Sequence, residues 1–161
     1  MKTFQHQKDL KGCGIACIAN LLNKTYDEVK RDFENKFYKI DRGVKIFDIV
    51  NYLKTLGLEY KSKFFNQSEE HKHKRNEAST FSHIPNSITL IAKSDVYIVG
   101  HYLLRIENGW IDPWINIRFA PLAHAKAGVR KELPGNAWYV LYPIDLHRKY
   151  QVTSEAIHIS S

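Results

Sequence analysis

Apolar residues recur with a helical period in the first third of the chain and predict helices there. Residues 13–23 carry one apolar stripe at the spacing i, i+3, i+4, i+7, formed by Ile15, Ile18, Ala19 and Leu22. Thr25 and Glu28 form the Thr-x-x-Glu sequence of a capping box, which predicts the start of a second helix. The inner face of that helix is expected at Tyr26, Val29 and Phe33.

A third helix is predicted over residues 44–56, because Gly57 then stands at the usual position of a C-terminal glycine stop. The inward-facing side chains of this helix are expected to be those of Ile46, Phe47, Ile49, Val50 and Leu53.

From residue 58 onward, short apolar or alternating runs predict strands at 58–65, 87–94, 96–114 and 137–144. The long run at 96–114 contains Asn108-Gly109, a pair typical of two-residue hairpin turns. Residues 66–86 are polar and without a period, so we expect a surface loop. Helices followed by strands favour an α+β fold, with N-terminal helices packed on an antiparallel sheet.

Length and composition suit one compact domain. The chain has 161 residues, 43% of them hydrophobic, which is enough for a single core. We expect this domain to cover residues 1–146, followed by a polar tail at 147–161. The sequence has no apolar run of about 18 residues and no secretory signal, so neither a membrane span nor export is expected. A cytoplasmic location is the expectation.

Cys13 and Cys17 are the two cysteines of the chain, four residues apart. A disulfide between them would strain a helix, so we interpret both as free thiols. Cys13 begins the first predicted helix, directly after Gly12. The dipole and free N–H groups of a helix N-terminus favour a thiolate there, which is what a nucleophilic cysteine requires. Cys17 is expected to be buried packing.

A cysteine nucleophile also needs a base, a group that orients the base, and donors for the oxyanion. His101 lies in an apolar strand directly after a glycine, and Asp112 lies at the end of the next predicted strand. A carboxylate there can hold an imidazole in one tautomer. Gln7 precedes Cys13 by six residues, where its amide can reach the oxyanion. Gly14 is expected to let a substrate backbone approach Cys13 closely.

These residues resemble a known family. The sequence Gln-x5-Cys-Gly-Ile-Ala-Cys from Gln7 to Cys17, followed by Gly-His-Tyr around His101 and Asp-Pro at Asp112, is similar to that of the bacteriocin-processing peptidases. These form the peptidase C39 family of papain-like cysteine proteases. The resemblance spans residues 5–142.

The resemblance implies that Cys13 is the nucleophile, His101 the base, Asp112 the orienting acid and Gln7 part of the oxyanion hole. It also implies a papain-like fold and a peptide substrate, such as a leader peptide cut after a double-glycine or similar pair. Because the sequence has no membrane segment and no phosphate-binding loop, we expect a stand-alone domain. Its partner would be a separate ABC exporter, which would also bring it to a membrane.

The sequence departs from the family at Gly12, where an acidic residue is usual, and in the charged segment 66–86. The position of Asp112 is a further difficulty. An Asn108-Gly109 turn would place Asp112 opposite Arg105, about 13 Å along the strand from His101. The same turn would place Asn116 opposite His101. Both Asp112 and Asn116 therefore stay open as the orienting group, and the family motif favours Asp112.

The remaining signals favour no other chemistry. His71 and His73 lie in the polar loop without a matching ligand set, so no metal and no other cofactor is expected. The net charge of +7 permits a polyanionic partner. No nucleic-acid-binding motif accompanies the basic residues, so no nucleic-acid partner is expected, and a basic nucleic-acid adaptor is only a third hypothesis. The second hypothesis is a catalytically inactive peptide-binding module of the same fold.

Overall fold

The computed structural model describes residues 3–65, 80–97 and 99–144. Within these ranges the helices are α1 (Cys13–Leu22), α2 (Tyr26–Lys36) and α3 (Ile46–Thr55), with short 3₁₀ helices at Ile40–Arg42 and Leu122–His124. The strands are β1 (Tyr60–Phe64), β2 (Ile88–Ile91), β3 (His101–Ile106), β4 (Gly109–Asp112), β5 (Gly128–Arg130) and β6 (Ala137–Pro143). The chain is α+β, as the order of sequence patterns predicts.

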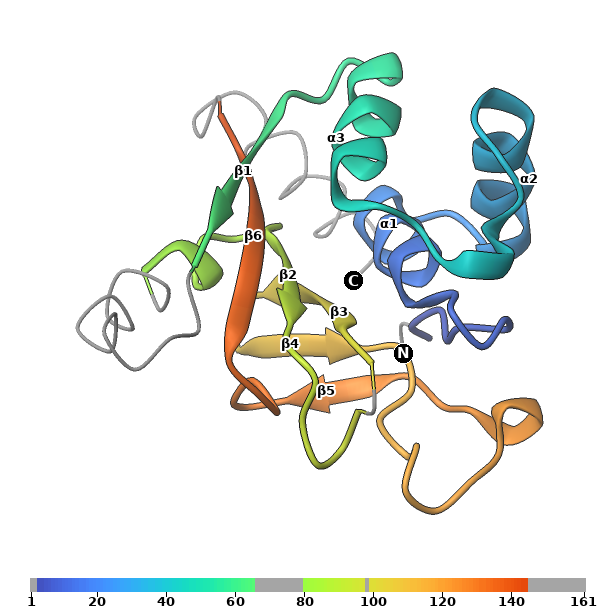
Figure 1. Cartoon of the computed structure of the whole chain (residues 1–161), viewed down its shortest axis with the longest axis vertical. Coiled ribbons are helices and arrows are strands. Elements are labelled where there is room, and N and C mark those ends of the chain that lie inside the picture. Colours follow the sequence, from blue (N-terminus) through green and yellow to red (C-terminus); the bar gives the residue numbers. More distant parts are fainter. Residues whose placement is uncertain (1–2, 66–79, 98, 145–161) are drawn as a thin grey trace.

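The strands that the structure describes form one six-stranded sheet in the order β1-β6-β2-β3-β4-β5, and every pair is antiparallel. Helices α1, α2 and α3 gather on one side of this sheet (Figure 1). Helix α1 packs against β3, and α3 packs against β1 and β6. The main core lies between these two layers, so the beginning of α1 is held beside the sheet.

The sequence patterns of the first two helices are confirmed. Ile15, Ile18 and Ala19 are fully buried on α1. The helix ends at Leu22 because the next residue, Asn23, adopts the left-handed conformation of a C-terminal cap. The capping box at the start of α2 is present, and the predicted inner residues of α2 are buried.

In α3, the prediction for Phe47 is wrong. Ile46, Ile49 and Leu53 are buried as expected, but the Phe47 side chain is 61% exposed. At 100° per residue, Phe47 points away from the face that these three residues share. Tyr52 occupies the inner position instead, with its ring fully buried.

The hairpin between β3 and β4 differs from the prediction by one residue. Ile106 pairs with Gly109, so the connecting residues are Glu107 and Asn108 rather than Asn108-Gly109. Gly109 belongs to β4, where a Cβ atom would lie 2.2 Å from the carbonyl oxygen of Arg130 on β5. The glycine is therefore required by the close approach of the next strand, and the turn forms without it.

Other strand predictions need smaller corrections. The run 96–114 becomes strand only from His101, and β5 has too little apolar pattern to be expected from the sequence. Of the predicted loop 66–86, residues 80–82 are helical. Residues 66–79, with His71 and His73, and the predicted tail 147–161 lie outside the described residues.

Candidate active site

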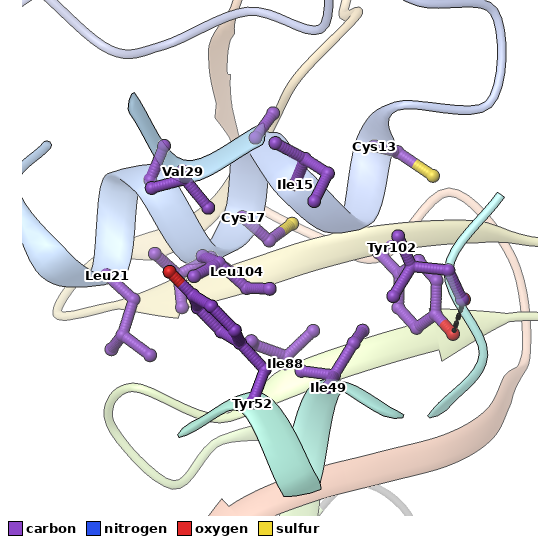
Figure 2. Close-up of a cluster of buried hydrophobic side chains, with 14 of the residues drawn as sticks. Cys13, Ile15, Cys17, Leu21, Val29, Ile49, Tyr52, Ile88, Tyr102 and Leu104 are labelled. Carbon is purple, nitrogen blue, oxygen red and sulfur yellow. Dashed lines mark hydrogen bonds between the residues drawn. The ribbon is translucent and has the colours of Figure 1, made fainter. Parts of the chain in front are cut away.

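Cys13 is the first residue of α1, and the N-cap residue Gly12 offers no side-chain hydrogen bond to the first turn. The helix N-terminus is therefore open to stabilise negative charge on the sulfur. The side chain of Cys13 lies at the margin of the core, beside Tyr102, whereas that of Cys17 is directed into the apolar cluster (Figure 2). Cys13 is 7% exposed and Cys17 is fully buried.

The two glycines around Cys13 have different packing reasons. A Cβ atom at Gly12 would lie 2.0 Å from the hydroxyl oxygen of Tyr26. A Cβ atom at Gly14 would lie 3.3 Å from the ring of Tyr102 and 3.4 Å from Val44. Gly14 thus faces the core, and the expectation that it admits a substrate backbone is wrong.

His101 and Asp112 approach each other on neighbouring strands. His101 begins β3 and Asp112 ends β4. Because Leu104 pairs with Ile111, continuing this register by one residue places Asp112 opposite Leu103, on the same face of the sheet as His101 and diagonal to it. The His101 Nε2 atom lies 2.8 Å from Asp112 Oδ1. The predicted Asn108-Gly109 turn would separate Asp112 from His101 along the strand. The observed turn, one residue earlier, brings their side chains into contact.

Asp112 holds His101 through Nε2, so the other ring nitrogen, Nδ1, is left for Cys13, whose pKa is coupled to that of the ring. Burial raises the pKa of the Cys13 thiol, but the charge of His101 and hydrogen bonding to its ring act in the opposite direction. The backbone N–H groups of Tyr102 and Gly14 also favour the thiolate, and the resulting pKa lies below the ordinary value.

The imidazole responds in the complementary sense. Burial lowers the pKa of His101, but the negative charge of Cys13 and the hydrogen bond to Asp112 outweigh burial and raise this pKa to about 9. A depressed thiol pKa and an elevated imidazole pKa together favour a thiolate–imidazolium pair at neutral pH.

Asp112 is fully buried and surrounded by donors. Its Oδ1 atom also accepts from the Trp114 N–H at 2.9 Å. Its Oδ2 atom accepts from the Tyr97 hydroxyl and from Arg130 Nε, the latter at 2.6 Å. Burial raises the pKa of Asp112, but its hydrogen bonds with His101, Tyr97 and Arg130 hold that pKa well below its usual range.

The sequence patterns single out neither Tyr97 nor Arg130. The Tyr97 ring stacks on the His101 ring, with centroids 3.9 Å apart and planes 8° from parallel. Tyr97 precedes His101 by four residues in a segment without regular structure, and Arg130 lies on the unexpected strand β5. No sequence motif connects either residue to Asp112. The one general indication is that a buried acid needs a cationic or hydrogen-bonding partner, but this does not identify which residue supplies it.

Gln7 is anchored close to the site. Its backbone N–H donates to the Pro113 carbonyl at 3.1 Å, directly after Asp112 in the chain. Its side-chain Nε2 donates to the carbonyls of Asp9 and Leu10 at 3.1 and 3.0 Å. The buried Oε1 atom has no hydrogen-bond partner among the described residues. Both N–H groups of the Gln7 side chain therefore already donate to backbone carbonyls. The free atom of the side chain is Oε1, which is an acceptor.

Asn116, the alternative orienting group, makes its contacts elsewhere. Its Nδ2 atom donates to the His124 carbonyl at 3.1 Å, and its Oδ1 atom accepts from the Lys126 N–H at 2.8 Å. Of the two candidates, only Asp112 has a hydrogen bond with His101 in the described structure.

No family model and no curated protein matches this sequence. Among solved structures, the chain is similar to the peptidase domain of Streptococcus ComA, a bifunctional ABC transporter involved in a quorum-sensing pathway. The TM-score is 0.52 at 16% sequence identity, and the match covers 89% of this chain and 98% of that domain. At this identity the likeness establishes the shared fold. None of the helices in the described residues has both the length and the apolar character needed to cross a bilayer.

Proposed function

We propose that this chain is a cysteine peptidase in which Cys13 is the nucleophile, His101 the general acid and base, and Asp112 the orienting group. The hydrogen bond between His101 Nε2 and Asp112 Oδ1 at 2.8 Å carries the proposal, because a buried carboxylate holds the imidazole whose charge favours the thiolate of the helix-terminal Cys13. The four donors around Asp112 keep it ionised, so it holds the ring through Nε2 and leaves Nδ1 for proton exchange with the sulfur.

The proposed reaction follows from the protonation states of the pair. The Cys13 thiolate attacks the carbonyl carbon of the scissile peptide bond. The imidazolium of His101 then gives its Nδ1 proton to the leaving amine as the C–N bond breaks and an acyl-enzyme forms. His101, now neutral, takes a proton from water, and the resulting hydroxide attacks the thioester. This attack gives a tetrahedral intermediate. Its collapse breaks the C–S bond, releases the carboxylic acid and restores the Cys13 thiolate and the His101 imidazolium.

The finer proposal is a papain-like, C39-like peptidase that removes a leader peptide after a pair of small residues such as Gly-Gly. It rests on the sequence motif around Cys13, His101 and Asp112 and on the fold shared with a transporter's peptidase domain. The proposed partner is accordingly a separate ABC exporter, and the proposed location is the cytoplasm, at a membrane when that partner is bound. No cofactor is required for this chemistry.

Donors for the oxyanion are proposed from two places. The backbone N–H of Cys13 lies in the uncapped first turn of α1. The Gln7 amide is the second proposed donor, and it must release one of its bonds to the Asp9 and Leu10 carbonyls to serve this purpose. A substrate carbonyl would therefore compete with a backbone carbonyl for the same N–H.

Two observations favour the inactive peptide-binding module as a second candidate. The amide hydrogens of Gln7 are already engaged, and the Cys13 side chain is 7% exposed, which restricts the approach of a scissile bond. A module of this kind would bind a leader-type peptide through the same fold without turnover.

Peptide turnover separates these candidates. A library of peptides with Gly-Gly, Gly-Ala and bulky pairs at the centre is incubated with the wild-type chain and with Cys13→Ala, and the products are read by mass spectrometry. Cleavage by the wild type alone supports the peptidase. Binding of the same peptides with equal affinity by both forms, and no product, would refute the peptidase and support the binding module.

A further inference from the structure

Three neighbouring strands place a row of charged side chains on one face of the sheet. Asp112 on β4 is diagonal to His101 on β3. On its other side, Arg130 of β5 pairs with Trp110, and Asp112 pairs with Gly128, so Arg130 is diagonal to Asp112 as well. Gly128 has no side chain beside the carboxylate, and the Arg130 guanidinium reaches Asp112 Oδ2 at 2.6 Å.

Tyr97 connects the two ends of this row. Its hydroxyl donates to Asp112 Oδ2 and accepts from Arg130 Nη2 at 3.2 Å, while its ring covers one face of His101. The Arg130 Nη2 atom also donates to the Ile115 carbonyl at 3.4 Å. The guanidinium is thus fixed at several atoms, although its side chain is 24% exposed.

The charges of this row balance only when Arg130 is counted. The titratable groups facing His101 are Cys13 from α1, Asp112 from β4 and Tyr97 from the segment before β3. Besides His101, Cys13 interacts with Tyr102 of β3 and Cys17 of its own helix, which are both neutral because burial raises their pKa values. With Cys13 as thiolate and His101 as imidazolium, Asp112 would leave one negative charge in excess. A buried net charge is costly, and Arg130 cancels it.

We propose that Arg130 and Tyr97 are positioning residues of the candidate site, and that Arg130 supplies the positive charge that allows Asp112 to stay ionised beside a Cys13 thiolate. The role of these residues in catalysis rests on the proposed function. The physical content of the inference, the protonation of Cys13, is measurable without any peptide substrate. Asp112 paired with Arg130 then orients the imidazole much as a neutral acceptor would, without adding a net negative charge next to the sulfur.

The expected effect has a definite sign. Removing the Arg130 charge makes the thiolate less stable, so the midpoint of Cys13 ionisation moves to higher pH. A unit charge about 12 to 24 Å away at an effective dielectric constant of about 20 corresponds to a shift of roughly 0.5 to 1 pH unit. Loss of the Tyr97 hydroxyl removes one hydrogen bond from the carboxylate while keeping the stacked ring, so it shifts the midpoint in the same direction by less.

The test measures the rate of Cys13 alkylation by iodoacetamide against pH in a Cys17→Ala background. Arg130→Gln removes the charge and retains donor groups, Arg130→Lys retains the charge, and Tyr97→Phe retains the ring. Lys131→Gln is the matched control, because it removes the same charge from the adjacent, exposed residue. Circular dichroism and thermal unfolding establish that each variant is folded.

The expected result is a midpoint raised by roughly 0.5 to 1 pH unit in Arg130→Gln, by less in Tyr97→Phe, and unchanged in Arg130→Lys and Lys131→Gln. A shift in Arg130→Lys as large as in Arg130→Gln would overturn the charge argument, and so would an equal shift in Lys131→Gln. If Arg130→Gln does not fold, a changed midpoint in folded Arg130→Lys also refutes the proposal. Failure of peptide cleavage would refute the proposed function and leave this result standing.

Discussion

The hydroxyl of Tyr26 occupies the space beside Gly12 that a side chain there would need. The same hydroxyl donates to Asp9 Oδ2 at 2.6 Å, and Lys30 pairs with the other oxygen of that carboxylate at 3.0 Å. A carboxylate therefore lies near the start of α1 although the residue before Cys13 is glycine. The departure from the family pattern at Gly12 has a packing cause, since an acidic side chain at this position would collide with Tyr26.

This relationship predicts a coupled pair of substitutions. Gly12→Ala should lower the free energy of unfolding by about 1–3 kcal/mol, because the new methyl group overpacks against a fully buried ring. In a Tyr26→Phe background the same substitution should cost less, since the nearest atom is gone. Urea unfolding of the two single variants and the double variant measures the coupling. Additive effects would contradict the proposed collision.

The two cysteines should respond differently to alanine substitution. Cys13→Ala is expected to abolish peptide cleavage, by about 10⁴-fold or more, together with rapid alkylation by iodoacetamide. Cys17→Ala should leave both largely intact, because burial raises the pKa of Cys17 well above its ordinary value and keeps that thiol protonated. Peptide mapping of the alkylated protein identifies the labelled residue. Activity lost with Cys17 alone would reverse the assignment.

The pH dependence of cleavage should be bell-shaped. Below the depressed pKa of Cys13 the nucleophile is protonated, and above the His101 pKa of about 9 no proton is available for the leaving amine. We therefore expect kcat/KM to fall on the alkaline side with a midpoint near 9. A peptide without ionisable groups in this range serves as substrate. A rate that still rises beyond about pH 10 would contradict the role of His101 as general acid.

Asp112→Asn should uncouple the imidazole from its charge partner. The asparagine oxygen can still accept from His101 and from the Trp114 N–H, but its NH₂ group faces the Arg130 donors. We expect the pKa of His101 to fall below about 9 and the free energy of unfolding to drop by about 2 kcal/mol. NMR titration of the imidazole and urea unfolding provide these values. Asp41→Asn, on an exposed residue, is the control and should change neither.

Gln7→Ala tests the oxyanion proposal. If the amide contributes a donor in the transition state, kcat should fall by about 10²-fold with KM little changed. Gln5→Ala is a matched control in the same segment, because the Gln5 side chain accepts from the Tyr26 N–H at 3.0 Å. Loss of this hydrogen bond lowers the stability of the segment without removing the Gln7 amide. Equal losses of kcat in both variants would indicate that Gln7 acts only through the fold of the N-terminal segment.

The parts of the fold that follow from local pattern could be predicted from the sequence. The stripe on α1 and the capping box of α2 are properties of a few consecutive residues, and the order of helices and strands follows from them. The prediction for Phe47 is wrong because Phe47 lies 100° around the helix from Ile46, outside the face that Ile46 shares with Ile49 and Leu53. The turn prediction is wrong by one residue because Gly109 is needed in β4, where it allows the close approach of β5. The short, half-polar sequence of β5 gives no strand signal of its own.

The candidate site also contains residues that could be predicted from the sequence and residues that could not. Cys13, His101 and Asp112 could be proposed because each belongs to a short motif. Arg130 could not, since its contact with Asp112 comes only from strand pairing, and Tyr97 could not, since it lies in a segment without regular structure. Arg130 reaches Asp112 across 18 positions of chain, and only the register of β4 and β5 brings the two together.

The two-residue connection between β3 and β4 thereby fixes more than the course of the backbone. Side chains alternate between the faces of a strand, so inserting one residue after Asn108 would turn Asp112 toward the helices and Ile111 toward His101. The buried acid would lose its arginine and its imidazole in a single step, although Cys13, His101 and Asp112 would all still be present. Among homologues of this chain, length variation is therefore expected to accumulate beyond β4, in the segment up to β5, while the hairpin itself keeps its length.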